Sequence, residues 1–171
     1  IQKLKGPQIL VRALGILARE RPELDVKLSV IGARSGAKEL NLQKLVEAES
    51  VEHLVRFSLP MPAGHLARAF RCADVVAVPS YSESFGLVAL EAQACGTPVL
   101  AHRVGGLPYA VKDGVTGILI DDTEPESWAR ELQARAAALA ELEALASPIH
   151  RDVTAGTDGL RLAYHPAYDP T

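Results

Sequence analysis

Residues 80–91 read Ser80-Tyr81-Ser82-Glu83-Ser84-Phe85-Gly86-Leu87-Val88-Ala89-Leu90-Glu91, and we expect them to join a strand to a helix. The apolar run Val75–Val78 before them predicts a buried strand, which Pro79 ends. The apolar segment 85–94 after them predicts a helix with Ser84 as its N-cap. A strand, loop and helix of this kind is the repeating unit of a parallel α/β sheet.

The start of this predicted helix is a candidate anion site. The amides of residues 85–87 have no intrahelical acceptor, and the helix dipole adds partial positive charge there. Glu83 lies just outside the helix. Glu91 lies seven residues beyond Ser84, which places it on nearly the same face, roughly 10 Å along the axis. Two carboxylates flanking free amides suit a ligand with hydroxyls at both ends and phosphates between them.

A simpler interpretation is available for each acid. Glu83 taken alone is better explained as a solvated loop residue. Glu91 can lie on an exposed helix edge, but Val88, Leu90 and Ala92 leave this helix little polar face for it to share. An acid in a helix that is apolar on nearly all sides needs a partner or a ligand.

The spacing of Glu83 and Glu91 resembles the Glu-x7-Glu motif of retaining glycosyltransferases with the GT-B fold, family 4 of that classification. The whole run from Val78 to Val99 extends the resemblance, as does Val104-Gly105-Gly106-Leu107-Pro108, and it covers residues 1 to about 133. The sequence most resembles the family members that act in mycothiol biosynthesis. Those enzymes transfer N-acetylglucosamine from UDP-N-acetylglucosamine to 1D-myo-inositol 3-phosphate. The implied fold is an open, doubly wound parallel sheet, the Rossmann-like C-terminal half of a GT-B enzyme.

The resemblance also implies which residues contact the donor: Lys5, Met61, Glu83, Ser84, Phe85, Gly86, Leu87 and Glu91. Lys5 would bind the diphosphate and Glu83 the sugar hydroxyls, which makes these two the catalytic candidates. Glu91 would bind the ribose hydroxyls, and main-chain atoms of Met61 would read the uracil edge. Taken without the resemblance, Lys5 is better explained as a surface lysine, and Met61 equally well as part of a proline-bracketed loop.

A structural Mg²⁺ site is implied at the end of the helix that precedes Val75. Its ligands would be main-chain carbonyls together with a threonine: Phe70, Arg71, Ala73 and Thr97. A plain helix end, where carbonyls lack intrahelical partners, explains the same residues without a metal. We expect no cofactor to be required for the chemistry itself.

Composition excludes several other classes of protein. The net charge of −3 makes a nucleic-acid partner improbable. No apolar run reaches membrane-spanning length. The two cysteines, Cys72 and Cys95, fall on apolar helical segments and suit free thiols in a reducing compartment, so we expect a cytoplasmic protein.

The rest of the chain alternates between helices and strands. We expect helices at 7–20, 38–49, 63–72 and 125–146, strands at 26–31, 54–57, 99–101 and 117–120, and a turn or short helix at 105–111. The family places a strand and a diphosphate-binding arginine before the first helix, so we expect a sheet that lacks its first strand. We expect residues 1–146 to form the nucleotide-sugar-binding domain and residues 147–171 a loosely ordered tail unlike the family.

Two functions follow from these expectations. The first is the donor-binding half of the glycosyltransferase described above, whose partners would be a UDP-sugar and an acceptor-binding domain missing before residue 1. The second is a non-catalytic nucleotide-sugar-binding fragment, or the remnant of a broken glycosyltransferase gene. On either account the chain alone should not transfer sugar.

Overall fold

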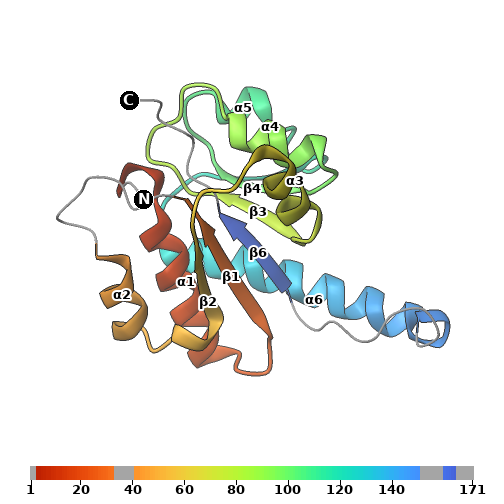
Figure 1. Ribbon diagram of the computed structural model, residues 1–171. Helices are drawn as coiled ribbons and strands as arrows, with labels where there is room; N and C mark the ends of the chain where they lie inside the picture. The colour runs from red at the N-terminus through yellow and green to blue at the C-terminus, as the bar shows by residue number, and fades with distance from the viewer. Residues whose placement is uncertain (1–2, 33–40, 151–159, 165–171) are drawn as a thin grey trace.

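The computed structural model describes residues 3–32, 41–150 and 160–164 (Figure 1). Its strands are β1 (Val26–Ile31), β2 (Val55–Ser58), β3 (Val75–Val78), β4 (Val99–His102), β5 (Gly117–Ile120) and β6 (Leu160–Tyr164). Its helices are α1 (Pro7–Glu20), α2 (Leu42–Ala48), α3 (Ala63–Arg71), α4 (Leu87–Ala94), α5 (Leu107–Ala110) and α6 (Pro125–His150), with 3-10 turns η1 (Lys3–Lys5) and η2 (Glu52–Leu54).

The strands form one sheet in the order β2-β1-β6-β3-β4-β5, and every neighbouring pair is parallel. From the centre the chain winds outward in both directions, through β1 to β2 and through β3 to β5. The predicted open, doubly wound parallel α/β sheet is therefore confirmed. In such a sheet ligands bind beyond the carboxyl ends of the strands, near the point where the winding reverses.

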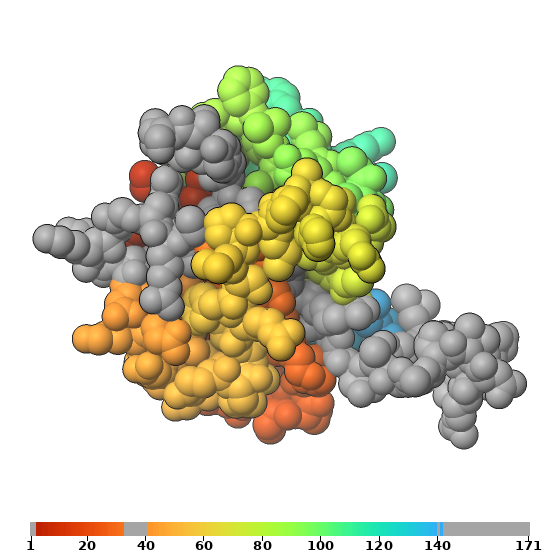
Figure 2. Space-filling model, viewed as in Figure 1, coloured from red at the N-terminus to blue at the C-terminus, as the bar shows by residue number. Residues whose placement is uncertain are grey.

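Helices pack against both faces of the sheet, and each face carries its own apolar cluster. Alternate residues of β3 belong to different clusters. Val75 and Ala77 pack with α1 and α6 on one face. Val76 and Val78 pack with α3, α4 and α5 on the other face. All four are buried. This explains why β3 is a continuous apolar run, since strands covered on both faces have no polar side. Figure 2 shows α3 and α4 side by side on the second face.

Trp128 fixes the long helix α6 to the sheet. Its side chain is fully buried, and its Nε1–H donates to the carbonyl oxygen of Asp122 at 3.1 Å. The buried indole supplies a large apolar area, while the hydrogen bond satisfies its only polar group. Beyond this anchor, α6 runs behind the sheet and its far end projects past the strands (Figure 1).

Most predicted elements lie close to where the sequence placed them, and α1, β1, β3 and β5 have the predicted bounds. Helix α2 begins at Leu42, where Asn41 caps it by accepting from the amide of Lys44 at 3.1 Å. The residues predicted to begin this helix earlier, 38–40, lie outside the described part of the chain. Helix α6 continues to His150, four residues beyond the predicted end.

The C-terminal part of the chain departs from the prediction. Residues 160–164 form a central strand, with Leu160 beside Val26 of β1 and Leu162 beside Val75 of β3. The prediction of a loosely ordered tail is wrong for these five residues, and the expected gap in the sheet is filled. The sequence there is the short, mostly apolar run Leu-Arg-Leu-Ala-Tyr, which is compatible with a strand but lies among Gly, Asp and Pro that favour turns.

Candidate functional site

The candidate site forms at the carboxyl edge of the sheet, where the turn η1 meets the loop that follows β3. The amide of Tyr81 donates to the carbonyl oxygen of Leu4 at 2.8 Å. Gly6 lies directly against Pro79, and a Cβ at this glycine would collide with the Pro79 carbonyl oxygen. Gly6 also has a left-handed conformation, with φ of 73°, as it begins α1. A glycine is thus needed to bring the start of the chain against the β3 loop.

These contacts bring Lys5 and Glu83 together across 78 residues of sequence. The Lys5 ammonium lies 2.9 Å from one oxygen of the Glu83 carboxylate, and the two side chains are 17% and 10% exposed. An ion pair with so little exposure is screened less by water than one on an open surface. The two residues proposed from the resemblance as catalytic candidates are therefore direct neighbours.

The second oxygen of Glu83 faces the start of α4. It accepts a hydrogen bond from the amide of Gly86 at 3.4 Å. The helix begins at Leu87, and its N-cap is Gly86, whose φ is 72°. The prediction that Ser84 caps a helix starting at Phe85 is therefore wrong. The helix therefore begins two residues later than expected, and the amide of its N-cap residue, Gly86, lies beside the Glu83 carboxylate.

A pair of glycines, Gly105 and Gly106, causes this shift. The amide of Gly106 donates to the carbonyl oxygen of Glu83 at 2.9 Å. A Cβ at Gly105 would collide with that same oxygen, and one at Gly106 would collide with the carbonyl oxygen of Ser84. The close approach holds residues 83–85 in a loop and delays the start of the helix until Leu87. These glycines are recognisable from the sequence as part of the motif at residues 104–108, but their contact with residues 83–85 depends on the tertiary fold.

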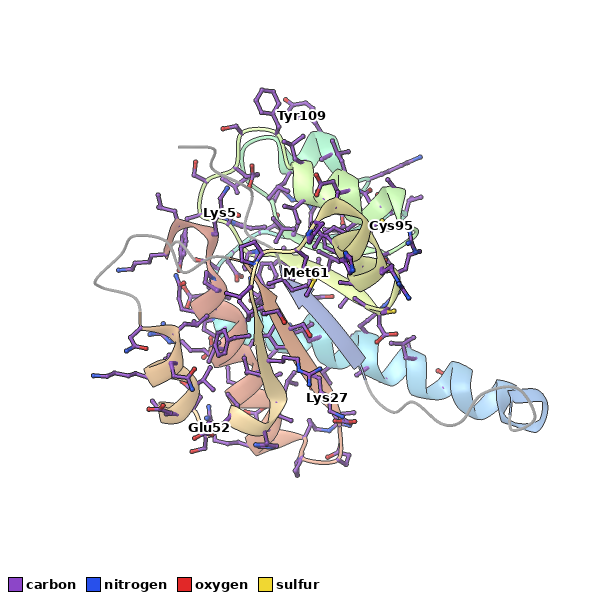
Figure 3. All side chains as sticks on the ribbon, viewed as in Figure 1. Lys5, Lys27, Glu52, Met61, Cys95 and Tyr109 are labelled. Atoms are coloured by element: carbon purple, nitrogen blue, oxygen red, sulfur yellow. The ribbon has the colours of Figure 1, made fainter. Side chains whose placement is uncertain are left out.

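The remaining predicted donor contacts lie around this loop. Ser84 is exposed, and the side chains of Phe85 and Leu87 are 74% and 57% exposed, whereas Gly86 is buried. Met61 follows β2 by three residues and is half-buried, so it also lies at the carboxyl edge. In Figure 3 Lys5 and Met61 both lie above Lys27 and Glu52.

Glu91 is exposed on the outer face of α4, next to Leu87 and Leu90, of which Leu90 is 47% exposed. The helix is apolar on nearly all sides, as its sequence indicates, but the expectation that it is buried on those sides is wrong. Only one face, including Val88 and Ala92, is buried. Glu91 therefore has no need of a partner to offset burial, and its assignment to the ribose hydroxyls stays a prediction from the resemblance.

The predicted Mg²⁺ ligands lie together at the end of α3, and two of them, the Phe70 carbonyl and the Thr97 hydroxyl, are hydrogen-bonded to each other. The hydroxyl of Thr97 donates to the carbonyl oxygen of Phe70 at 2.7 Å, and the amide of Ala73 donates to the same oxygen at 2.9 Å. A cation at Phe70 would have to displace one of these donors. Hydrogen bonding thus accounts for this helix end, and the metal site stays a prediction.

Charged side chains also gather beyond β4 and β5. Arg103 pairs with both Asp113 and Asp121. The pKa of Asp113 is lowered, first by the amide of Leu119, which donates to it at 2.9 Å, and then by the Arg103 side chain. The pKa of Arg103 is raised by its two acidic partners. This network ties the loop before β5 to the strand ends at the same edge of the sheet.

The fold and site together define a class, a doubly wound parallel α/β domain with a lysine–glutamate pair beside a helix N-terminus at the carboxyl edge of its sheet. A sequence model described as glycosyl transferases group 1 matches residues 1–136. The chain therefore belongs to the group 1 glycosyl transferase family.

Curated relatives give the resemblance more detail. The chain is 54% identical over 133 residues to the D-inositol 3-phosphate glycosyltransferase of Paenarthrobacter aurescens, covering 78% of this chain and 33% of that protein. It is 52% identical over 138 residues to the protein of that name from Streptomyces coelicolor, and the match covers 78% of this chain and 30% of that protein. The chain thus spans about a third of the length of the curated relatives it matches.

Solved structures agree on the fold. Sucrose-phosphate synthase from Thermosynechococcus elongatus superposes with a TM-score of 0.70 at 35% identity, covering 78% of this chain and 33% of that one. Anabaena HepE, solved in complex with UDP-glucose, superposes with a TM-score of 0.68 at 29% identity, covering 78% and 36%. Within the part of the chain that the structure describes, no helix is long and apolar enough to cross a bilayer.

Proposed function

We propose that this chain is the nucleotide-sugar-binding half of a retaining glycosyltransferase of mycothiol biosynthesis. Its donor would be UDP-N-acetylglucosamine and its acceptor 1D-myo-inositol 3-phosphate. The observation that carries the proposal is the meeting of Lys5, Glu83 and the first amide of α4 at the carboxyl edge of the sheet. The identity of 54% to a D-inositol 3-phosphate glycosyltransferase supports the choice of acceptor.

Each group at the site has a role in this proposal. The Lys5 ammonium and the amides of Gly86 and Leu87 stabilise the negative charge of the diphosphate. The Glu83 carboxylate accepts from hydroxyls of the sugar, and Glu91 accepts from the two ribose hydroxyls. Exposed Ser84 and Phe85 line the path of the sugar, and main-chain atoms of Met61 pair with the uracil edge.

In the proposed reaction the bond between the anomeric carbon and the diphosphate oxygen breaks, and a bond to an acceptor hydroxyl forms on the same face of the sugar. The acceptor proton leaves with UDP. Charge accumulates on the departing diphosphate, so Lys5 and the start of α4 contribute most where that charge is greatest. A Mg²⁺ ion held at Phe70, Arg71, Ala73 and Thr97 would be structural, and no step depends on it.

In a second candidate function, the chain binds a nucleotide sugar but does not transfer the sugar. The chain spans about a third of the length of its curated relatives, which is the observation that favours this second function. The groups described at the site suit a donor, and none has been assigned to an acceptor.

Isothermal titration calorimetry tests the binding that both functions share. We expect the chain to bind UDP and UDP-N-acetylglucosamine, with GDP binding at least tenfold more weakly because its base does not match the edge read at Met61. UDP-glucose is the control for recognition of the acetamido group. Equal affinity for UDP and GDP would contradict the proposal, as would no binding of any of the four.

A further inference from the structure

Both oxygens of the Glu83 carboxylate accept hydrogen bonds from groups of the chain itself. One oxygen accepts from the Lys5 ammonium at 2.9 Å, and the other accepts from the Gly86 amide at 3.4 Å. The side chain is only 10% exposed, so these two donors replace much of the water that would otherwise solvate it. A carboxylate between an ammonium and a helix N-terminus is in the position that suits an anion.

Those two donors are the ones that the proposed function assigns to the diphosphate. We infer that Glu83 is a resident counter-ion of the donor site, which an incoming diphosphate must displace. The inference rests on the proposed function and adds a regulatory step to it. A diphosphate bound at the Lys5 ammonium and the Gly86 amide would lie against the Glu83 carboxylate, so repulsion between the two anions makes diphosphate binding compete with this placement of Glu83.

The backbone of Glu83 is fixed, but its side chain is able to move. Gly105 and Gly106 hold the carbonyl oxygen of Glu83, and Tyr81 anchors the loop to Leu4. The carboxylate is joined to this fixed backbone by rotatable bonds, so a change of rotamer moves it away from Lys5 without moving the loop. The displacement therefore needs no rearrangement of the fold.

The sugar decides whether the displacement is compensated. Sugar hydroxyls donate to a carboxylate, so a UDP-sugar gives Glu83 new partners when it leaves Lys5 and Gly86. UDP alone has only its ribose hydroxyls, which the proposed function assigns to Glu91, so Glu83 loses its hydrogen bonds without gaining new ones while a second anion arrives. Intact donor is thus favoured over UDP, and after transfer Glu83 returns to Lys5 and helps to release the product.

The test compares the wild-type chain with Glu83→Gln, which keeps the size and hydrogen-bonding oxygen of the side chain but removes its charge. Glu52→Gln is the matched control, since Glu52 is an exposed acid at the opposite end of the molecule from Lys5 (Figure 3). By calorimetry, we expect Glu83→Gln to bind UDP roughly three- to tenfold more tightly than wild type. We expect Glu83→Gln to bind UDP-N-acetylglucosamine no more tightly than wild type does. The ratio of the affinity for UDP-N-acetylglucosamine to the affinity for UDP should therefore be smaller in the variant.

Unchanged or weaker UDP binding by Glu83→Gln would overturn the inference, as would the same gain in Glu52→Gln. The proposed function fails separately, if the wild-type chain binds neither UDP nor the UDP-sugar. Inorganic pyrophosphate then serves as the probe, because it needs only the anion position. Tighter pyrophosphate binding by Glu83→Gln than by wild type supports the inference, and equal or absent binding in both overturns it. Circular dichroism establishes that each variant is folded.

Discussion

Glu91 is the residue whose proposed role is easiest to separate from folding. Its side chain is exposed on α4, and it makes no ion pair with any residue in the described ranges. We expect Glu91→Ala to weaken UDP binding by roughly 1.5–3 kcal/mol, the cost of losing hydrogen bonds to a charged group. Its free energy of unfolding should change by no more than about 0.5 kcal/mol.

Calorimetric titration with UDP and urea denaturation measure the two quantities. Glu47→Ala is the control, since Glu47 is also an exposed glutamate on a helix but lies on α2. A folded Glu91→Ala chain with wild-type affinity for UDP would remove the ribose assignment.

Gly105 offers a test of the packing that delays α4. Its φ is 55°, and a Cβ would collide with the Glu83 carbonyl oxygen. Gly114 has a comparable φ of 72°, but nothing lies within 4 Å of a Cβ placed there. Gly114→Ala is therefore the control, since it introduces backbone strain without a collision. We expect Gly105→Ala to lower the free energy of unfolding by about 1–3 kcal/mol more than Gly114→Ala does. Urea denaturation of both variants checks this, and equal losses would mean that the close approach is unimportant.

At the scale of secondary-structure elements, the strands were predictable because short apolar runs end at Pro or Gly, as β3 does at Pro79. The start of α4 was not, because Gly106 reaches Glu83 from a distant part of the sequence and overrides the local preference for a cap at Ser84. The same limit applies to the site. Its residues came from a motif, whereas the pairing of Lys5 with Glu83 depends on tertiary contacts.

The loop between α5 and β5 should respond to acid. Asp113 has a lowered pKa in the folded chain, so its contribution to stability is fully present above the ordinary carboxyl pKa. That contribution is lost as the pH falls through the lowered value. We expect Asp113→Asn to be less stable than wild type at pH 7, with the difference shrinking in strong acid. Urea denaturation from pH 7 down to pH 3 measures it, and a difference independent of pH would contradict the role of the charge.

At the scale of the whole molecule, we expect the chain to bind its donor but not to transfer the sugar at enzymatic rates. Holding both reactants in position supplies roughly 7–11 kcal/mol of the barrier, and the residues to which we propose roles would position only the donor. Water also reaches an open site, which weakens the charged contacts to the diphosphate.

Separating glycosylated product from free sugar by chromatography tests this, with UDP-N-acetylglucosamine and 1D-myo-inositol 3-phosphate as substrates. Slow release of free sugar is the expected outcome. Turnover at ordinary enzymatic rates by the 171-residue chain would show that its site is complete.

The central position of β6 has a consequence for how the protein reaches this structure. Within the described part of the chain, the sheet hydrogen bonds between the β1–β2 half and the β3–β5 half all pass through β6. The two halves can each form early, but they join only when residues from the far end of the sequence enter between them. Closing so long a loop costs entropy before any contact offsets it, which makes folding slow. During synthesis, the edges of β1 and β3 that pair with β6 are thus unpaired until the ribosome has delivered residues 160–164. Unpaired strand edges of this kind are prone to aggregation.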